Sequence, residues 1–174
     1  MSMLTSILYL FPFLMISAIC MDLFTMQISN KLTMGIAVGF LPVALLSGLP
    51  FWSLELESIA LHFACGLSVL LMSFTLFAVG KIGGGDAKLM AASAIWIGWA
   101  QLLDYLVIAA FLGGAFAILL LIARAFPLPL VMLKQPWIAR LHTPKGPLPF
   151  GVALGIGAIV VYSRTPVWLS AMGS

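Results

Sequence analysis

Six long runs of apolar residues, separated by short polar segments, make up most of the chain. They cover about Leu4–Met21, Leu32–Leu49, Ile59–Val79, Leu89–Leu103, Leu106–Ala123 and Phe150–Tyr162. A membrane-spanning helix needs about 20 predominantly apolar residues, so runs of this length predict transmembrane helices. The pattern predicts an all-α integral membrane protein, a bundle of about six transmembrane helices. The tight turn between the fourth and fifth helices is expected at Asp104 and Tyr105.

The composition agrees with this pattern and narrows the class of protein. The chain has 174 residues, of which 63% are hydrophobic and only 7% are charged, and its mean hydropathy is +1.21. A soluble domain is typically about 45–50% apolar and about 25% charged. We therefore exclude a soluble enzyme, a disordered tail and a nucleic-acid-binding domain. Six spans use roughly 120 residues, so residues 1–174 are expected to form a single membrane-embedded domain whose partner is the lipid bilayer.

The basic residues predict the orientation of this bundle. If the amino terminus lies outside, the cytoplasmic loops and their edges contain Lys31, Lys81, Lys88, Arg124, Lys134, Arg140 and Lys145. Arg164 is the one basic residue on the opposite side, where the outer loops carry Glu55, Glu57 and Asp104. Since Lys and Arg are enriched in cytoplasmic loops, the predicted location is the cell inner membrane, crossed several times, with the amino terminus outside.

Two carboxylates lie at the cytoplasmic ends of predicted helices. Asp22 follows the first apolar run and Asp86 precedes the fourth, so both are expected at one depth. Ionisable groups near hydrocarbon are costly and are functional candidates. Two close carboxylates cannot both ionise easily, and one charged with one protonated Asp is what aspartic-protease chemistry requires. The alternative is a loop acid at Asp22 and a helix N-cap at Asp86; spacing alone leaves both open.

Glycines directly before Asp86 add to the functional interpretation. Gly83, Gly84 and Gly85 allow positive φ and close approach of another backbone, so they are candidates for contact with an extended peptide substrate. The alternatives are a flexible turn or a phosphate-binding loop, and GxxxxGK[ST] is absent. Lys88 either tunes the acid and holds a substrate or reaches the membrane interface as a snorkelling lysine. Asn30 is expected to cap the second helix.

Three segments together resemble a known family. Gly84-Gly85-Asp86-Ala87-Lys88-Leu89, with Gly83 as the first glycine, resembles the GxGD-type motif of type IV prepilin peptidases. Asp22, followed by Ile28-Ser29-Asn30-Lys31-Leu32-Thr33, resembles the family's first motif, in which proline is usual at the position of Ser29. Leu148-Pro149-Phe150-Gly151-Val152-Ala153 resembles the Pro-aromatic-Gly segment that opens the last helix.

The resemblance implies a membrane aspartyl endopeptidase whose catalytic pair is Asp22 and Asp86, with no metal or organic cofactor. Its implied substrates are prepilins or pseudopilins, cut between a short basic leader and a hydrophobic helix at the cytoplasmic face. The amino-terminal methyltransferase segment of longer members is expected to be missing. The chain is similar to the short, peptidase-only form that accompanies tight-adherence (Flp) pilus systems. The sequence leaves a homo-oligomer open.

Three other functions are compatible with the same residues. One is a non-catalytic membrane scaffold of a pilus or secretion machine that retains the motifs. Another is a small proton-coupled transporter that uses the same carboxylates, although both acids lie at one edge and no inverted repeat is evident. The third is a preflagellin-type peptidase, which changes the substrate and keeps the chemistry.

Overall fold

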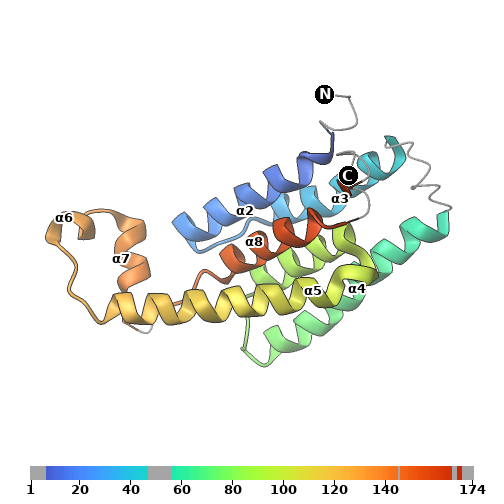
Figure 1. The fold of residues 1–174 in the computed structure, drawn as a ribbon. Coiled ribbons are helices and arrows are strands. Elements are labelled where there is room, and N and C mark those ends of the chain that lie inside the picture. Colours follow the sequence, from blue (N-terminus) through green and yellow to red (C-terminus); the bar gives the residue numbers. More distant parts are fainter. Residues whose placement is uncertain (1–6, 47–55, 145, 166–167, 170–174) are drawn as a thin grey trace.

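The computed structural model describes residues 7–46, 56–144, 146–165 and 168–169. Within these ranges every regular element is a helix, which confirms the predicted all-α class (Figure 1). The helices are α2 (Leu10–Thr25), α3 (Asn30–Leu46), α4 (Leu56–Ala78), α5 (Gly84–Arg124), α6 (Leu130–Leu133), α7 (Pro136–His142) and α8 (Phe150–Tyr162). Glu55 and Lys145, which entered the topology prediction, lie outside the described residues.

The lengths and surfaces of the helices fit a membrane environment. Among the described residues, α4 over Ile59–Ala78 and α5 contain stretches that are long and apolar enough to cross a membrane. The mean hydropathy of the most apolar 18-residue stretch is 2.0 in α4 and 2.8 in α5. Helices α2, α3 and α8 are apolar but shorter. Large apolar side chains stay exposed around the bundle, including Phe13 at 67% and Phe111 at 76%. Surfaces of this kind mark a lipid or protein contact.

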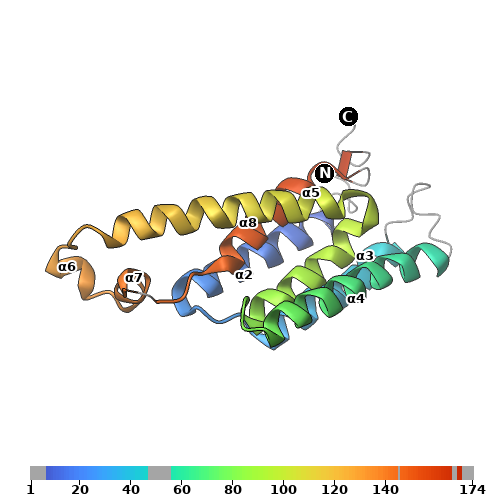
Figure 2. The ribbon, with the colours of Figure 1, turned by 90° about the horizontal axis from the view of Figure 1, so that it is seen from below.

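The prediction of a turn at Asp104 and Tyr105 is wrong. The chain is helical through both residues, and the break lies earlier, at Gly98, where φ is 72° and ψ is 176°. Figures 1 and 2 show the ribbon of α5 reversing direction, so that its two parts run back alongside each other. Tyr105 is fully buried in the core and Asp104 is exposed on the helix. The two residues therefore point to different sides of one helix and do not form a loop.

Gly98 suits this position for two physical reasons. Its φ and ψ values are essentially restricted to glycine, and a Cβ atom there would lie 2.8 Å from Cε1 of His62. Nδ1 of His62 donates a hydrogen bond to the carbonyl oxygen of Ile95 (2.6 Å), one turn before the break. Trp99 donates its indole N–H to the carbonyl of Leu61 (3.1 Å). Side chains at the break therefore fasten it to α4.

We expect Gly98→Ala to lower the free energy of unfolding by about 2–4 kcal/mol, because it combines backbone strain with a clash against His62. Thermal denaturation of the purified protein in detergent measures this change. Gly114→Ala is the matched control, since its new methyl group meets nothing within 4 Å. The control should raise stability by about 0.5–1 kcal/mol. Equal midpoints for the two variants would contradict the role assigned to Gly98.

The core forms where α5 packs against α3, α4 and α8, and α2 packs against α8. Aromatic rings pack between these helices. Phe11 stacks on Trp96 with 4.9 Å between the ring centroids, and its ring lies 4.7 Å from that of Tyr162. Phe40 packs edge-on against Trp96, with 5.7 Å between the ring centroids. The connections 26–29 and 79–83, and the described residues that join α5 to α8 (125–144 and 146–149), lie at the end of the bundle away from the Gly98 break, where α6 and α7 project beyond it (Figure 2). The packing thereby brings the polar segments together.

Candidate active site

Asp22 lies in the last turn of α2. The helix ends at Thr25, and Met26 caps it with a left-handed φ of 53°, while the N–H of Met26 donates to the carbonyl of Asp22 at 2.8 Å. Thr25 fixes the exit, because its hydroxyl donates to the carbonyl of Met21 at 2.6 Å and accepts from the N–H of Gln27 at 3.2 Å. The residue Asp22 as a whole is 4% exposed. The local hydrogen bonds thus hold a buried acid at the point where the chain leaves the helix.

Asp86 lies in the first turn of α5. Gly83 is the N-cap, with extended backbone (φ −74°, ψ 146°), and Asp86 is the third helical residue. The Asp86 carboxylate turns back to accept the N–H of Gly83, an interaction known from capping boxes. It also interacts favourably with the positive end of the helix dipole. Asp86 is therefore not the N-cap itself, as the alternative interpretation had it, but its carboxylate is held beside the N-cap residue Gly83.

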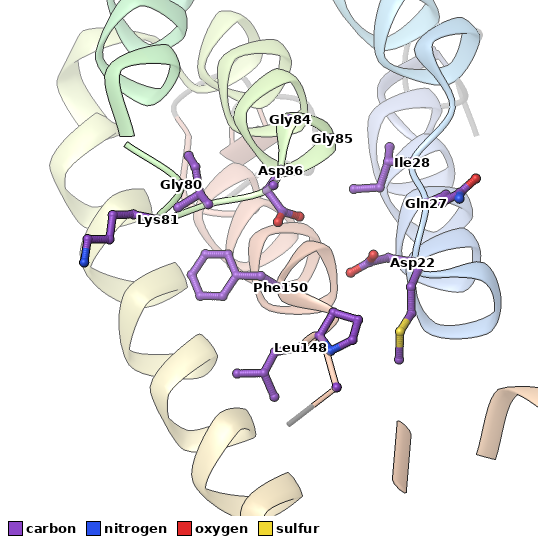
Figure 3. Close-up of a pocket in the computed structure, with 15 residues that line it drawn as sticks. Asp22, Gln27, Ile28, Gly80, Lys81, Gly84, Gly85, Asp86, Leu148 and Phe150 are labelled. Carbon is purple, nitrogen blue, oxygen red and sulfur yellow. The ribbon is translucent and has the colours of Figure 1, made fainter. Parts of the chain in front are cut away.

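The two carboxylates face each other across a cavity of about 850 Å³. Figure 3 shows Asp22 and Asp86 pointing toward one another from α2 and α5. They are close enough for their negative charges to repel. Asp22 and Asp86 line the cavity together with Met26, Gln27, Ile28, residues 80–85, Gly146, Pro147, Leu148 and Phe150. The fold therefore brings together two acids that are 64 residues apart in the sequence.

The three glycines before Asp86 all line this cavity, but none of them uses positive φ. Gly84 and Gly85 are already helical, and the positive φ of the connection belongs to Gly80 at 71°. Small size is what matters at Gly83 and Gly85. A Cβ atom would lie 2.9 Å from Oδ2 of Asp86 at Gly83 and 3.4 Å from Cβ of Ile28 at Gly85. Larger residues would therefore crowd the acid or narrow the cavity.

The amino-terminal end of α8 forms the wall behind Asp22. The backbone N–H groups of Gly151 and Val152 approach its carboxylate. Oδ2 of Asp22 is nevertheless buried and accepts no hydrogen bond from the part of the chain that the structure describes. A helix amino terminus favours negative charge nearby. A methyl group added at Gly151 would lie 2.8 Å from this Oδ2 atom and 2.7 Å from Cδ1 of Ile28.

Arg124 organises the loop that leads into α8, a role that the sequence did not indicate. Its guanidinium donates to three backbone carbonyls: Nε to Leu141 at 2.7 Å, and the two terminal nitrogens to Gly146 and Pro147 at 3.2 Å. Gly146 and Pro147 line the cavity. On the other side, Arg140 donates to the carbonyl of Phe24 at the end of α2. From the sequence, the two arginines predicted only the orientation of the bundle in the membrane.

We expect Arg124→Lys to loosen this loop, because one ammonium group cannot reproduce a planar fork that serves three carbonyls. Hydrogen bonds from charged groups are each worth about 1.5–3 kcal/mol, so cleavage of the 125–149 segment by a soluble protease should accelerate at least tenfold. Arg164→Lys, at the carboxyl end of α8, is the control. Unchanged protease sensitivity in Arg124→Lys would contradict the anchoring role.

Lys88 and Asn30 lie beside the cavity of Asp22 and Asp86 and do not line it. Nζ of Lys88 donates to Oδ1 of Asn30 at 2.9 Å, which joins the first turns of α5 and α3.

The prediction that Asn30 caps α3 is wrong. Ser29 stands one residue earlier, directly before the helix, and its hydroxyl accepts the N–H of Lys31 at 3.2 Å. Both residue types can cap, and position relative to the first helical residue decides between them.

Comparison with known proteins gives one family. The model of the type IV leader peptidase family matches residues 9–118, which include both aspartates. Two curated relatives, each named prepilin leader peptidase/N-methyltransferase and found in Burkholderia pseudomallei strains 1026b and K96243, are 36% identical over 89 residues. That match covers 51% of this chain and 24% of each relative, so the chain spans only a fraction of their length. No solved structure matches.

Proposed function

Because the chain belongs to the type IV leader peptidase family, we propose that it is an aspartic endopeptidase that removes leaders from prepilins or pseudopilins. The observation that carries this proposal is the pair Asp22 and Asp86, which project from different helices into one cavity. The proposed substrates resemble Flp prepilins, with a short basic leader followed by an apolar helix. Cleavage falls at the junction of the two, at the cytoplasmic membrane face.

In the proposed mechanism the two carboxylates share one proton, as close acids do. The end of α8 favours the negative charge on Asp22, so Asp22 takes a proton from water. The water oxygen attacks the carbonyl carbon of the scissile peptide bond, while protonated Asp86 hydrogen-bonds the carbonyl oxygen. The proton taken by Asp22 then passes to the leaving nitrogen as the C–N bond breaks. The mechanism needs no metal or organic cofactor.

The surroundings of the pair suit a peptide substrate. Gly83, Gly84 and Gly85 form a wall of small residues beside Asp86 and admit an extended backbone near it. Burial of Asp22 at 4% exposure limits the solvent around the reacting groups, which strengthens electrostatic interactions there. The uncommitted Oδ2 atom of Asp22 is available to accept a proton from an entering water.

The placement of charge supports a cytoplasmic site in the inner membrane. Lys81 lines the cavity, Lys88 adjoins it, and Arg124 and Arg140 hold its loop. These residues lie at one end of the bundle, as the positive-inside rule requires of a cytoplasmic end. Helices α2, α3, α4, the two parts of α5 and α8 supply six helical segments for the proposed six spans. The amino terminus then faces outside.

Reconstitution tests the proposal. The purified protein is placed in liposomes with a synthetic Flp-like prepilin, and the products are identified by mass. We expect one cut at the junction between leader and apolar helix. Intact prepilin after prolonged incubation, with the protease correctly inserted, would favour a scaffold. A proton flux that depends on a pH gradient in the same liposomes would favour a transporter.

A further inference from the structure

A second cavity, of about 600 Å³, opens between α3 and α4 on the side of the bundle. We call it the α3–α4 groove. Its floor is α5, with Ala91, Ala92 and Ile95, and its rims include Met34 of α3 and Leu67 of α4. These rim side chains are 66% and 57% exposed. The groove is therefore largely apolar and open along the side of the bundle.

The helices determine the shape of the groove. Helices α3 and α4 pack mainly on α5 and hardly on each other. They come together at the far end, where Phe40 of α3 stacks on His62 at 5.0 Å and meets Phe63 edge-on at 5.9 Å. At the near end the Lys88–Asn30 hydrogen bond crosses from α5 to α3. Between these ends, α5 rises through about two turns, roughly 10 Å.

The near end of the groove adjoins the catalytic cavity. Gly85 and Ile28 line the cavity, whereas Lys88 and Asn30, only a few residues further along the same two segments, line the groove. The groove thus begins within one turn of Asp86 and runs away from it along α5. The first residues after a bond cut at Asp86 would therefore lie close to the near end of the groove.

We propose that the α3–α4 groove binds the first turns of the substrate's apolar helix, directly after the scissile bond. This inference rests on the proposed function, which supplies a substrate with such a helix. Alanines on the floor allow close approach of another helix, as at helix interfaces in membranes. The side-chain oxygen of Asn30 lies where the first turn of that helix would present unpaired N–H groups, and it can accept a hydrogen bond from one of them. The groove then fixes which bond reaches the aspartates.

Photocrosslinking tests the occupant without requiring cleavage. Met34, on the groove rim, is replaced by a photoreactive phenylalanine derivative in an Asp86→Asn background, and the prepilin is supplied in liposomes. Val38 is the matched control position, because it lies one turn further on α3, is 56% exposed and does not line the groove. We expect adducts from position 34 to the first residues after the cut site. Lipid adducts alone, or equal prepilin yields from both positions, would overturn the proposal.

A kinetic test separates the groove from the catalytic pair. Ala37→Trp places an indole side chain in the groove, and Val38→Trp places the same side chain outside it. We expect Ala37→Trp to raise KM about tenfold for full prepilin, and to leave unchanged the cleavage of a leader peptide that ends shortly after the junction. Val38→Trp should change neither reaction. An unchanged KM in Ala37→Trp, or equal losses on both substrates, contradicts the groove; a wild type that cuts neither substrate contradicts the proposed function instead.

Discussion

Asparagine at position 22 or 86 is expected to reduce leader cleavage by about a thousandfold or more. General acid–base catalysis by one positioned group contributes about 10²–10⁴-fold to the rate. When two groups act as a unit, removing either one loses most of their joint effect on the rate. Asp22→Asn removes the acceptor of the water proton, and Asp86→Asn removes the proton that supports the scissile carbonyl. Initial rates with purified variants and a prepilin in liposomes measure both effects.

The matched control for these substitutions is Asp104→Asn. Asp104 is an exposed acid on the second part of α5 and lies outside the cavity, so its replacement should leave the rate within about twofold of wild type, as is usual for surface positions. Membrane insertion is checked for every variant. A near-wild-type rate in either Asp22→Asn or Asp86→Asn would show that the two acids do not act as a pair.

Gly151→Ala is the second substitution with a large expected effect. The new methyl group would lie 2.8 Å from Oδ2 of Asp22, closer than such contacts normally come. Either the carboxylate or the start of α8 must move, and a displacement of about 1 Å at a catalytic group can cost about 100-fold in rate. We therefore expect kcat to fall about 100-fold, while the protein still folds and inserts.

Gly114→Ala again provides the control, because it makes the same change in a helix where nothing lies within 4 Å. It should retain the wild-type kcat. If Gly151→Ala cleaves prepilin at the wild-type rate, the end of α8 does not hold Asp22 in place. The described role of α8 would then be limited to packing.

Much of the fold could be predicted from the sequence, because run length and hydropathy act locally. The apolar runs correspond to α2, α3, α4, the two parts of α5, and α8. The turn at Gly98 was missed because a polar residue such as Asp104 can stand either in a turn or on the exposed side of a helix. The actual break depends on the backbone conformation of Gly98, which polarity does not indicate. A glycine between Trp96 and Trp99 in a long apolar run was the available signal.

The sequence predicted how deep in the membrane the two aspartates lie, but it did not predict how they face each other. Counting helices and charges places Asp22 and Asp86 at the same end of the bundle, and the resemblance pairs them. That they face one cavity depends on how α2 and α5 both pack against α8, which involves contacts between residues distant in the sequence. Arg124 was missed for the same reason, since its partners are backbone carbonyls that any sequence supplies.

The most direct test of the two-aspartate peptidase is the mass of a Flp-like prepilin co-expressed with this chain. With the wild type, we predict that the prepilin loses the mass of its leader. With Asp22→Asn or Asp86→Asn, inserted at the same level, the prepilin should keep its full mass. Full-length prepilin beside the wild type, or a shortened prepilin beside either variant, would contradict the account.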